Sequence, residues 1–170
     1  MRRIGITGGI GSGKSVVSRL LRIMGYSVYD TDSEAKRLME SSLEVVQKLS
    51  ECFGRDIYHN GRLNRGLLSS RVFGDSDKIV LLNSIVHTVV RFDFYRWSES
   101  LNEEICFVES AILYESRFDE LVDEVWTVTA PEELRISRVR QRSGLTEEEI
   151  KKRMAAQLSE EEKQRRAAHI

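Results

Sequence analysis

The sequence predicts an α/β fold with a largely parallel sheet, and three observations support that fold class. Short apolar runs typical of strands recur at residues 4–7, 26–29, 105–108 and 124–129. Segments with helical periodicity separate these runs, so strands and helices alternate along the chain. A glycine-rich loop, residues 8–15, joins the first strand to the first helix. Ligands of such sheets bind beyond the carboxyl ends of the strands, where we therefore expect the functional residues.

The composition indicates a soluble globular protein of one domain. The chain has 170 residues, of which 41% are hydrophobic and 31% are charged. Its 26 Lys and Arg balance 27 Asp and Glu, which argues against a general nucleic-acid binder. The chain shows no apolar stretch long enough for a signal peptide or a membrane span. Cys52 and Cys106 lie among apolar residues, far apart, so we expect buried, reduced thiols and a cytoplasmic protein without membrane partners.

The first two strands and the helix between them follow from local patterns. The run at 4–7 ends in glycines, and a helix over 14–24 follows it. That helix carries one predicted apolar face and ends at Gly25; the face consists of Val16, Val17, Leu20, Leu21 and Met24. The second strand ends in Asp30-Thr31-Asp32. The period of a strand would place Asp30 and Asp32 on the same side.

The middle of the chain is predicted to be mainly helical. Capping-box spacings start helices at Thr31, with Glu34, and at Ser41, with Glu44. Residues 54–74 hold four glycines and are predicted to be rich in loops. A long helical pattern over 76–104 is predicted to be interrupted near His87-Thr88.

The last third returns to strands and then helices. The strand at 105–108 is apolar throughout, which indicates burial on both faces, and it ends at Glu109. The strand at 124–129 precedes Pro131. Two further helices begin at capping boxes, which pair Thr146 with Glu149 and Ser159 with Glu162.

The loop after the first strand matches the phosphate-binding motif G-x-x-x-x-G-K-[ST]. Its glycines let the backbone wrap around a phosphate, and its N–H groups together with the helix N-terminus attract an anion. Lys14 is expected to reach the β- and γ-phosphates, and the Ser15 hydroxyl to bind Mg²⁺. ATP with Mg²⁺ is the expected ligand, and GTP stays open as the nucleotide. The expected contacts of the nucleotide are Gly9, Ile10, Gly11, Ser12, Gly13, Lys14, Ser15 and Val16.

Other features favour a small-molecule kinase among proteins with this loop. A GTPase would carry an Asn-Lys-x-Asp segment, which this chain lacks. Asp32 is predicted to position the acceptor hydroxyl and take its proton, with Asp30 in support. The alternative for either carboxylate is that it caps the following helix.

Arginines after Pro131 are candidates for stabilising the transferred phosphoryl group. The stretch contains Arg135, Arg138, Arg140 and Arg142. Arg138 and Arg142 are four residues apart and share a helix face, as do Arg135 and Arg138. Neighbouring glutamates leave a solvated helix face as the alternative.

Taken together, these residues resemble the dephospho-CoA kinase family. The resemblance runs in order over nearly the whole chain. It rests on segments 7–15, 30–32, 61–65 with Leu68 and Phe73, 85–87, 113–115, 122–126, Arg138 with 142–145, and 153–157 with Lys163.

The resemblance implies a fold and an activity. The fold is a three-layer P-loop NTPase domain like that of nucleoside-monophosphate kinases. A single kinase domain, 1–170, would comprise a core of about 1–32 and 105–131, a helical acceptor-binding region of about 33–104 and a lid of about 132–165. The reaction is ATP-dependent phosphorylation of the ribose 3′-hydroxyl of dephospho-CoA, the last step of coenzyme A biosynthesis.

The resemblance also assigns roles to single residues. It places the catalytic aspartate at Asp32 and the lid arginines at Arg138 and Arg142. Lys36, which stands where the family has arginine, and Arg65 would meet the acceptor. His87 is a further acceptor-binding candidate, and Thr88 replaces the family's usual proline.

Two other functions stay open, and so does the oligomeric state. A shikimate-type kinase also has a phosphate loop and an Asp-Thr-Asp segment, but this chain lacks the Phe-Arg-x-x-Glu segment expected of one. A non-catalytic nucleotide-dependent switch is the second. The family pattern normally continues past Ile170 into a strand and a final helix, so this C-terminal pair is expected to be missing from the chain.

Overall fold

A computed structural model describes residues 1–170 of the chain, which divides into two compact units. The first unit combines Met1–Asp30 with Ser98–Ile170, and the second consists of Thr31–Trp97. Each unit has its own cluster of buried apolar residues.

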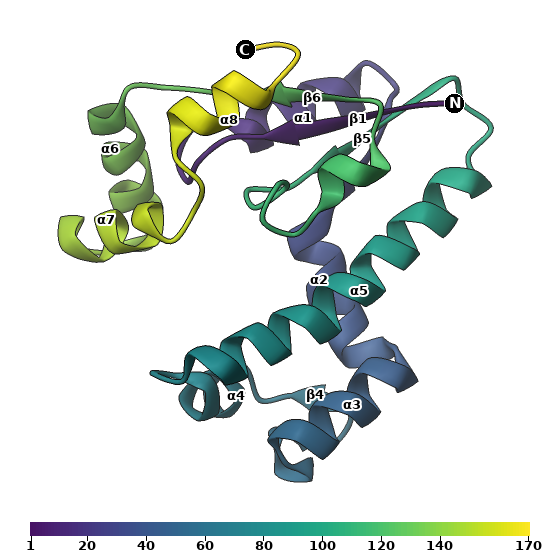
Figure 1. The fold of residues 1–170 in the computed structure, drawn as a ribbon, viewed down its shortest axis with the longest axis vertical. Helices are drawn as coiled ribbons and strands as arrows, with labels where there is room; N and C mark the ends of the chain where they lie inside the picture. The colour runs from purple at the N-terminus through teal and green to yellow at the C-terminus, as the bar shows by residue number, and fades with distance from the viewer. The chain divides into compact units, whose positions relative to one another are not determined.

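The first unit is built on a four-stranded parallel sheet (Figure 1). Its strands are β1 (Arg2–Thr7), β2 (Ser27–Asp30), β5 (Ile105–Glu109) and β6 (Glu124–Thr127), in the order β2-β5-β1-β6. Asp30 pairs with Glu109, Glu109 pairs with Ile6, and Thr7 pairs with Thr127. The carboxyl ends of all four strands therefore meet at one edge, as a parallel sheet requires. The predicted α/β fold with a parallel sheet is confirmed.

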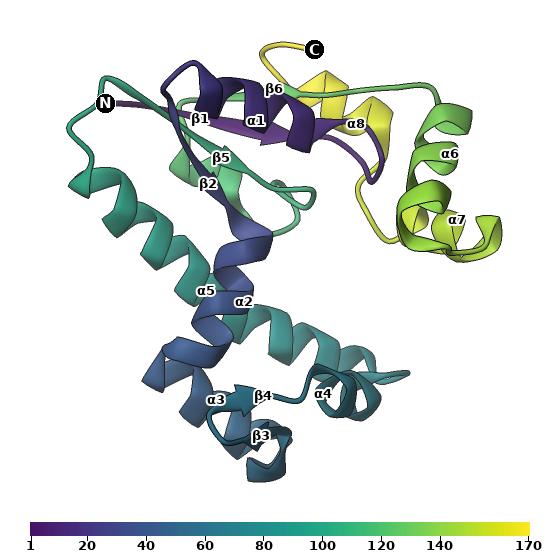
Figure 2. The ribbon, with the colours of Figure 1, turned by 180° about the vertical axis from the view of Figure 1, so that it is seen from behind.

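Helices cover both faces of this sheet (Figures 1 and 2). Helix α1 (Lys14–Ile23) lies on one face and α8 (Glu160–Arg166) on the other. A short 3₁₀ turn, Phe118–Leu121, precedes β6. Helices α6 (Glu132–Ser143) and α7 (Glu147–Ala155) follow β6 and lie together beyond its end.

The apolar face predicted for α1 is only partly correct. Leu21 is buried in a core cluster with Ile4, Ile6 and Phe107, and Val17 packs against that cluster. The other three residues of the predicted face are exposed, namely Val16, Leu20 and Met24. Of the predicted apolar face, only Val17 and Leu21 contact the core beneath the helix. The part of α1 that is buried is therefore narrower than its apolar face.

The predicted signals in the last third agree with the structure. Thr146 and Glu149 form a complete capping box, and the Ser159 hydroxyl accepts a hydrogen bond from the N–H of Glu162. Cys106 in β5 is fully buried, as expected. Beyond α8 the backbone runs beside β6, where the Thr127 N–H donates to the His169 carbonyl at 2.8 Å.

The second unit consists of helices around a small hairpin. Its helices are α2 (Thr31–Ser41), α3 (Leu43–Phe53), α4 (Arg65–Val72) and α5 (Ser76–Ser100), the last of which runs on into the first unit. A 3₁₀ turn, Arg55–Ile57, leads into β3 (Tyr58–His59), which pairs antiparallel with β4 (Arg62–Leu63). The core of the unit contains Val45, Leu49, Phe53, Ile57, Leu63, Leu68 and Val72.

Several local predictions in this unit were wrong. Residues 54–74 hold the hairpin and α4 rather than mainly loop, because Ile57, Leu63 and Leu68 are drawn into the core. The cap of α3 is Ser42, whose hydroxyl accepts from the Val45 N–H, and not Ser41. Cys52 on α3 is exposed, so the expected burial of its thiol was wrong.

Helix α5 is continuous through His87 and Thr88, so the predicted interruption was wrong. Both residues lie inside the helix Ser76–Ser100. The Thr88 hydroxyl donates to the Ser84 carbonyl at 2.7 Å, a bond within the helix that leaves the helical ladder intact. Thr88 lowers helix propensity slightly, which the packed neighbours of the helix outweigh.

None of the helices in the structure combines the length and the apolar character needed to span a membrane.

The core of the second unit gives a test of its packing. Leu49 is fully buried, whereas Leu43 on the same helix is 87% exposed. We expect Leu49→Ala to lower the free energy of unfolding by about 2–5 kcal/mol because it leaves a cavity. Leu43→Ala should stay within about 0.5 kcal/mol of the wild type. Urea denaturation followed by circular dichroism measures both, and equal losses would contradict this core.

His87 gives a pH-dependent test of α5. Burial, and secondarily the positive charge of Arg91, lower the pKa of His87 below its usual 6.5. As pH falls through 6.5 the unfolded chain therefore takes up a proton before the folded chain does, and the fold is destabilised. We expect the free energy of unfolding of the wild type to fall more steeply below this pH than that of His87→Gln. Parallel slopes in denaturant titrations of the two proteins would contradict this prediction.

Candidate active site

The phosphate loop lies at the carboxyl edge of the sheet, between β1 and α1. Thr7 ends β1 and is fully buried, and α1 begins at Lys14. Gly13 precedes the helix with a φ of 112°, a left-handed conformation that a residue with a Cβ rarely adopts. No side chain caps α1, and its first turn has no acidic residue. The N-terminus of this helix is therefore suited to an anion.

Lys14 is held inside the loop. It is 9% exposed, and its Nζ donates to the carbonyls of Gly8 at 2.8 Å and Gly9 at 3.3 Å. The Gly9 carbonyl also accepts from the N–H of Ser12 at 3.1 Å, which closes the turn of the loop. A positive charge thus lies next to the backbone donors of the loop, the combination that binds a polyphosphate.

The residues of the loop fit a nucleotide phosphate chain. The Ser12 Oγ atom is buried and has no hydrogen-bond partner in the protein. A buried hydroxyl without a partner is unfavourable, and a phosphate oxygen would satisfy it. Ser15 is exposed in the first turn of α1, where its hydroxyl is accessible to a metal ion.

The two predicted arginines of α6 lie in different surroundings. The Nη1 atom of Arg138 donates to the carbonyls of Gly11 at 3.3 Å and Ser12 at 3.2 Å, so the structure brings this side chain to the loop. Arg142 lies one turn further along, in the last turn of α6, and is exposed. The structure therefore joins Arg138 to the loop through carbonyl groups and leaves Arg142 on the surface.

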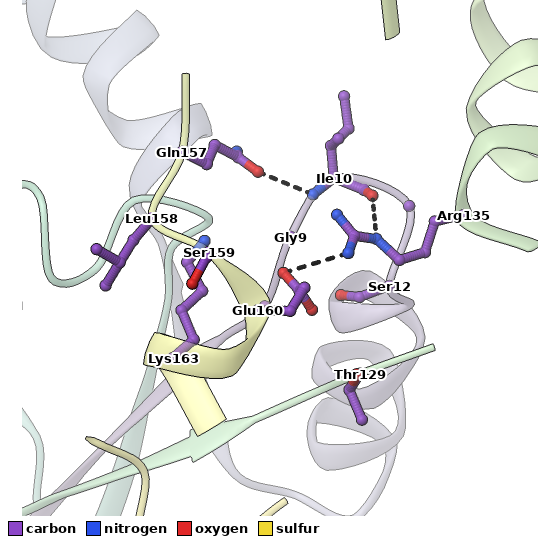
Figure 3. Close-up of polar contacts among 12 residues, drawn as sticks. Gly9, Ile10, Ser12, Thr129, Arg135, Gln157, Leu158, Ser159, Glu160 and Lys163 are labelled. Carbon is purple, nitrogen blue, oxygen red and sulfur yellow. Dashed lines mark hydrogen bonds and ion pairs between the residues drawn. The ribbon is translucent and has the colours of Figure 1, made fainter. Parts of the chain in front are cut away.

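Three further side chains lie at the loop, of which only Arg135 was among the predicted phosphoryl-stabilising arginines. Arg135 is 4% exposed, and its Nε atom donates to the Ile10 carbonyl at 3.1 Å. The Gln157 Oε1 atom accepts from the Ile10 N–H at 3.0 Å (Figure 3). Glu160 forms an ion pair with Arg135, with 3.4 Å between Oε1 and Nη1. The three-residue spacing of Arg135 and Arg138 was the one available signal for Arg135. Gln157 belonged to the family pattern, and Glu160 had no signal.

The segment that carries Gln157 is anchored to the rest of the first unit. The Leu158 N–H donates to Glu115 at 2.6 Å, and Lys163 lies 3.8 Å from the same carboxylate. Lys163 is fully buried, and its Nζ donates to the Ala111 carbonyl at 2.9 Å. Burial lowers the pKa of Lys163, an effect that the nearby carboxylates of Glu115 and Glu160 oppose.

Four predicted site residues lie in the second unit. Asp32 and Lys36 are exposed on α2, and Asp32 lies in its first turn. Arg65 begins α4 and forms an ion pair with Glu40 at 3.3 Å. His87 is half-buried in α5.

The prediction that Asp30 and Asp32 share one side of a strand was wrong. Asp30 is the last residue of β2, and helix α2 begins at Thr31. The alternation of a strand therefore stops before Asp32, whose side chain follows helical geometry instead.

Comparisons with known proteins agree with this fold and this loop. A family model described as dephospho-CoA kinase matches residues 2–170. A curated relative named dephospho-CoA kinase, from Porphyromonas gingivalis, is 45% identical over 161 residues, which cover 95% of this chain and 80% of the relative.

Two solved structures resemble the chain over nearly its whole length. A protein from Thermus thermophilus, TT1252, is 39% identical with a TM-score of 0.87, covering 99% of this chain and 86% of the other. A dephospho-CoA kinase from Campylobacter jejuni is 25% identical with a TM-score of 0.72, covering 100% and 88% of the two chains. With a family match across residues 2–170 and a complete phosphate loop, the chain belongs to the dephospho-CoA kinase family.

Proposed function

We propose that this protein transfers the γ-phosphoryl group of ATP to the ribose 3′-hydroxyl of dephospho-CoA, which gives coenzyme A. The observation that carries the proposal is the family match over residues 2–170, which includes a complete phosphate loop with its lysine buried inside. The reaction is the last step of coenzyme A biosynthesis, and the reduced, buried thiol of Cys106 suits a cytoplasmic location.

The loop and the start of α1 bind the nucleotide in this proposal. The loop residues from Gly9 to Val16 surround the phosphates, and the Ser12 hydroxyl gains an acceptor that it lacks in the protein. Lys14 leaves its two carbonyl partners to neutralise charge on the β- and γ-phosphates. Ser15 would hold Mg²⁺, which supplies positive charge to the phosphates during transfer.

Asp32 acts as the base toward the acceptor. Its carboxylate accepts the proton of the 3′-hydroxyl while the hydroxyl oxygen forms a bond to the γ-phosphorus. The bond between the γ-phosphorus and the bridging oxygen breaks, and ADP leaves. The place of Asp32 in the first turn of α2, two residues after β2 ends, supports this role as the base. Substrates of such sheets bind beyond the ends of the strands.

Other side chains complete the proposed reaction. Arg138 and Arg142 stabilise the transferred phosphoryl group as part of a lid of about 132–165. Arg138 must then exchange its bonds to the loop carbonyls for bonds to phosphate oxygens. Lys36, Arg65 and His87 bind the acceptor within a helical region of about 33–104, where the two cations suit the acceptor's phosphates.

The family membership favours dephospho-CoA over shikimate as the acceptor. We expect purified protein with MgATP to release ADP when dephospho-CoA is added and to show only background release with shikimate. A coupled ADP assay measures both, and the product is identified by mass. Stimulation by shikimate, or ATP binding without turnover on either acceptor, would overturn the proposed reaction.

Substitutions separate the base from the phosphate site. Asp32→Asn removes the proton acceptor but not the phosphate loop, so we expect kcat to fall by about 10²–10⁴-fold with little change in ATP affinity. Lys14→Ala should lower both turnover and ATP affinity, because the phosphates lose their cation. Near-normal turnover of Asp32→Asn in a folded protein would remove Asp32 as the base.

A further inference from the structure

We propose that Gln157 and Arg135 are positioning residues that set the orientation of two consecutive peptide groups in the phosphate loop. Through Gln157, the segment between α7 and α8 then controls the affinity of the loop for a polyphosphate. This inference deepens the proposed function, and it rests on that function only in treating the loop as the nucleotide site.

The peptide group between Gly9 and Ile10 is held on both sides. Its N–H donates to Gln157 Oε1 at 3.0 Å, and its carbonyl accepts from Lys14 Nζ at 3.3 Å and from the Ser12 N–H at 3.1 Å. The N–H and C=O of a trans peptide point in opposite directions, and the chain has no cis peptide bond. Gln157 therefore helps determine where the Gly9 carbonyl, one of two carbonyls that accept from Lys14, points.

The next peptide group, between Ile10 and Gly11, is held from the opposite side. Its carbonyl accepts from Arg135 Nε at 3.1 Å, so the N–H of Gly11 points away from Arg135. In Figure 3, Gln157 and Arg135 approach Ile10 from two different segments of the chain. Rotation of either peptide group would break one of these two bonds.

Gly9 shows how closely the side chains of Arg135 and Glu160 approach the loop. The motif allows any residue there, and the backbone of Gly9 lies outside the left-handed region. A Cβ atom on Gly9 would overlap both the Arg135 guanidinium and the Glu160 carboxylate. The ion pair of Arg135 and Glu160 thus explains this glycine by close approach rather than by conformation.

The ion pair of Arg135 with Glu160 is largely buried. Arg135 has a side chain only 5% exposed, and the Glu160 Oε2 atom is buried without a hydrogen-bond partner. The Leu158 N–H bond to Glu115 holds the backbone next to Gln157. These contacts restrict the Gln157 side chain before any ligand binds, so little entropy is lost when the loop takes its binding shape.

The test compares Gln157→Met with the wild type, since methionine has a similar volume but offers no strong acceptor to the Ile10 N–H. Gln157 is half-buried, so the variant is expected to fold. Loss of one hydrogen bond to the loop should raise the Kd for inorganic tripolyphosphate, and for MgATP, about tenfold. Tripolyphosphate is used because it needs neither the base nor the acceptor, and calorimetry measures both constants.

A second readout follows the peptide group itself. Hydrogen exchange of the Ile10 amide should speed up about tenfold or more in Gln157→Met, because its protecting partner is gone. Gln157→Glu keeps an acceptor oxygen, so the Ile10 amide should stay protected as in the wild type. If Gln157 had only a structural role, exchange of the Ile10 amide would not depend on whether the side chain at position 157 carries an acceptor.

The matched control is Gln164→Met on α8. Gln164 is also half-buried, but its Nε2 atom donates to Thr129 Oγ1 at 3.2 Å and not to the loop. Its tripolyphosphate affinity should equal that of the wild type. Wild-type affinity in folded Gln157→Met, or an equal loss in Gln164→Met, would overturn the inference. Failure of the wild type to phosphorylate dephospho-CoA would overturn the proposed function alone.

Discussion

The first unit depends on holding a buried lysine under a loop that must keep its N–H groups available to an anion. Lys14 is stabilised by the carbonyls of Gly8 and Gly9, which lie on the same loop. Because each trans peptide directs its N–H opposite to its C=O, carbonyls turned toward Lys14 turn their partner N–H groups elsewhere. The orientation of a few peptide groups therefore decides both where the cation lies and what the loop can bind.

The sheet fixes where the loop lies, and the segments after β6 fix the orientation of its peptide groups. Parallel strands with aligned carboxyl ends place the loop beside β5 and β6 and start α1 directly after it. Helix α6 and the segment after α7 then contribute side chains that hold single peptide groups, which strands alone do not reach. Glycine at position 9 allows the second set of contacts to approach closely.

The two units share the proposed chemistry unequally. The phosphate loop and its surrounding arginines belong to the first unit, whereas the proposed base and the acceptor-binding residues belong to the second. The chain passes from one unit to the other between Asp30 and Thr31, so the two aspartates of one short segment fall in different units. Asp30, the predicted supporting carboxylate, is held by strand pairing. Asp32, the proposed base, lies in the first turn of a helix.

Most patterns that depend on neighbouring residues were predicted well, although the cap of α3 is Ser42 and not the predicted Ser41. The phosphate loop, the four main strands and the capping serine and threonine of the last two helices follow from spacing along the chain, because each reflects contacts within a few residues. The family resemblance extended these local signals to the fold as a whole. Predictions failed where packing from a distance decided the outcome, as at Cys52, at the continuous helix α5 and at the exposed residues of α1.

The sequence by itself therefore determined the fold class, the phosphate loop and the family. Only the tertiary structure decided that Arg135, Gln157 and Glu160 gather on that loop, and that Arg138 binds its carbonyls. Residues 125 and 147 positions away from Ile10 meet its two peptide groups. No local pattern encodes such a meeting, because it results from how the sheet and the helices after it pack together.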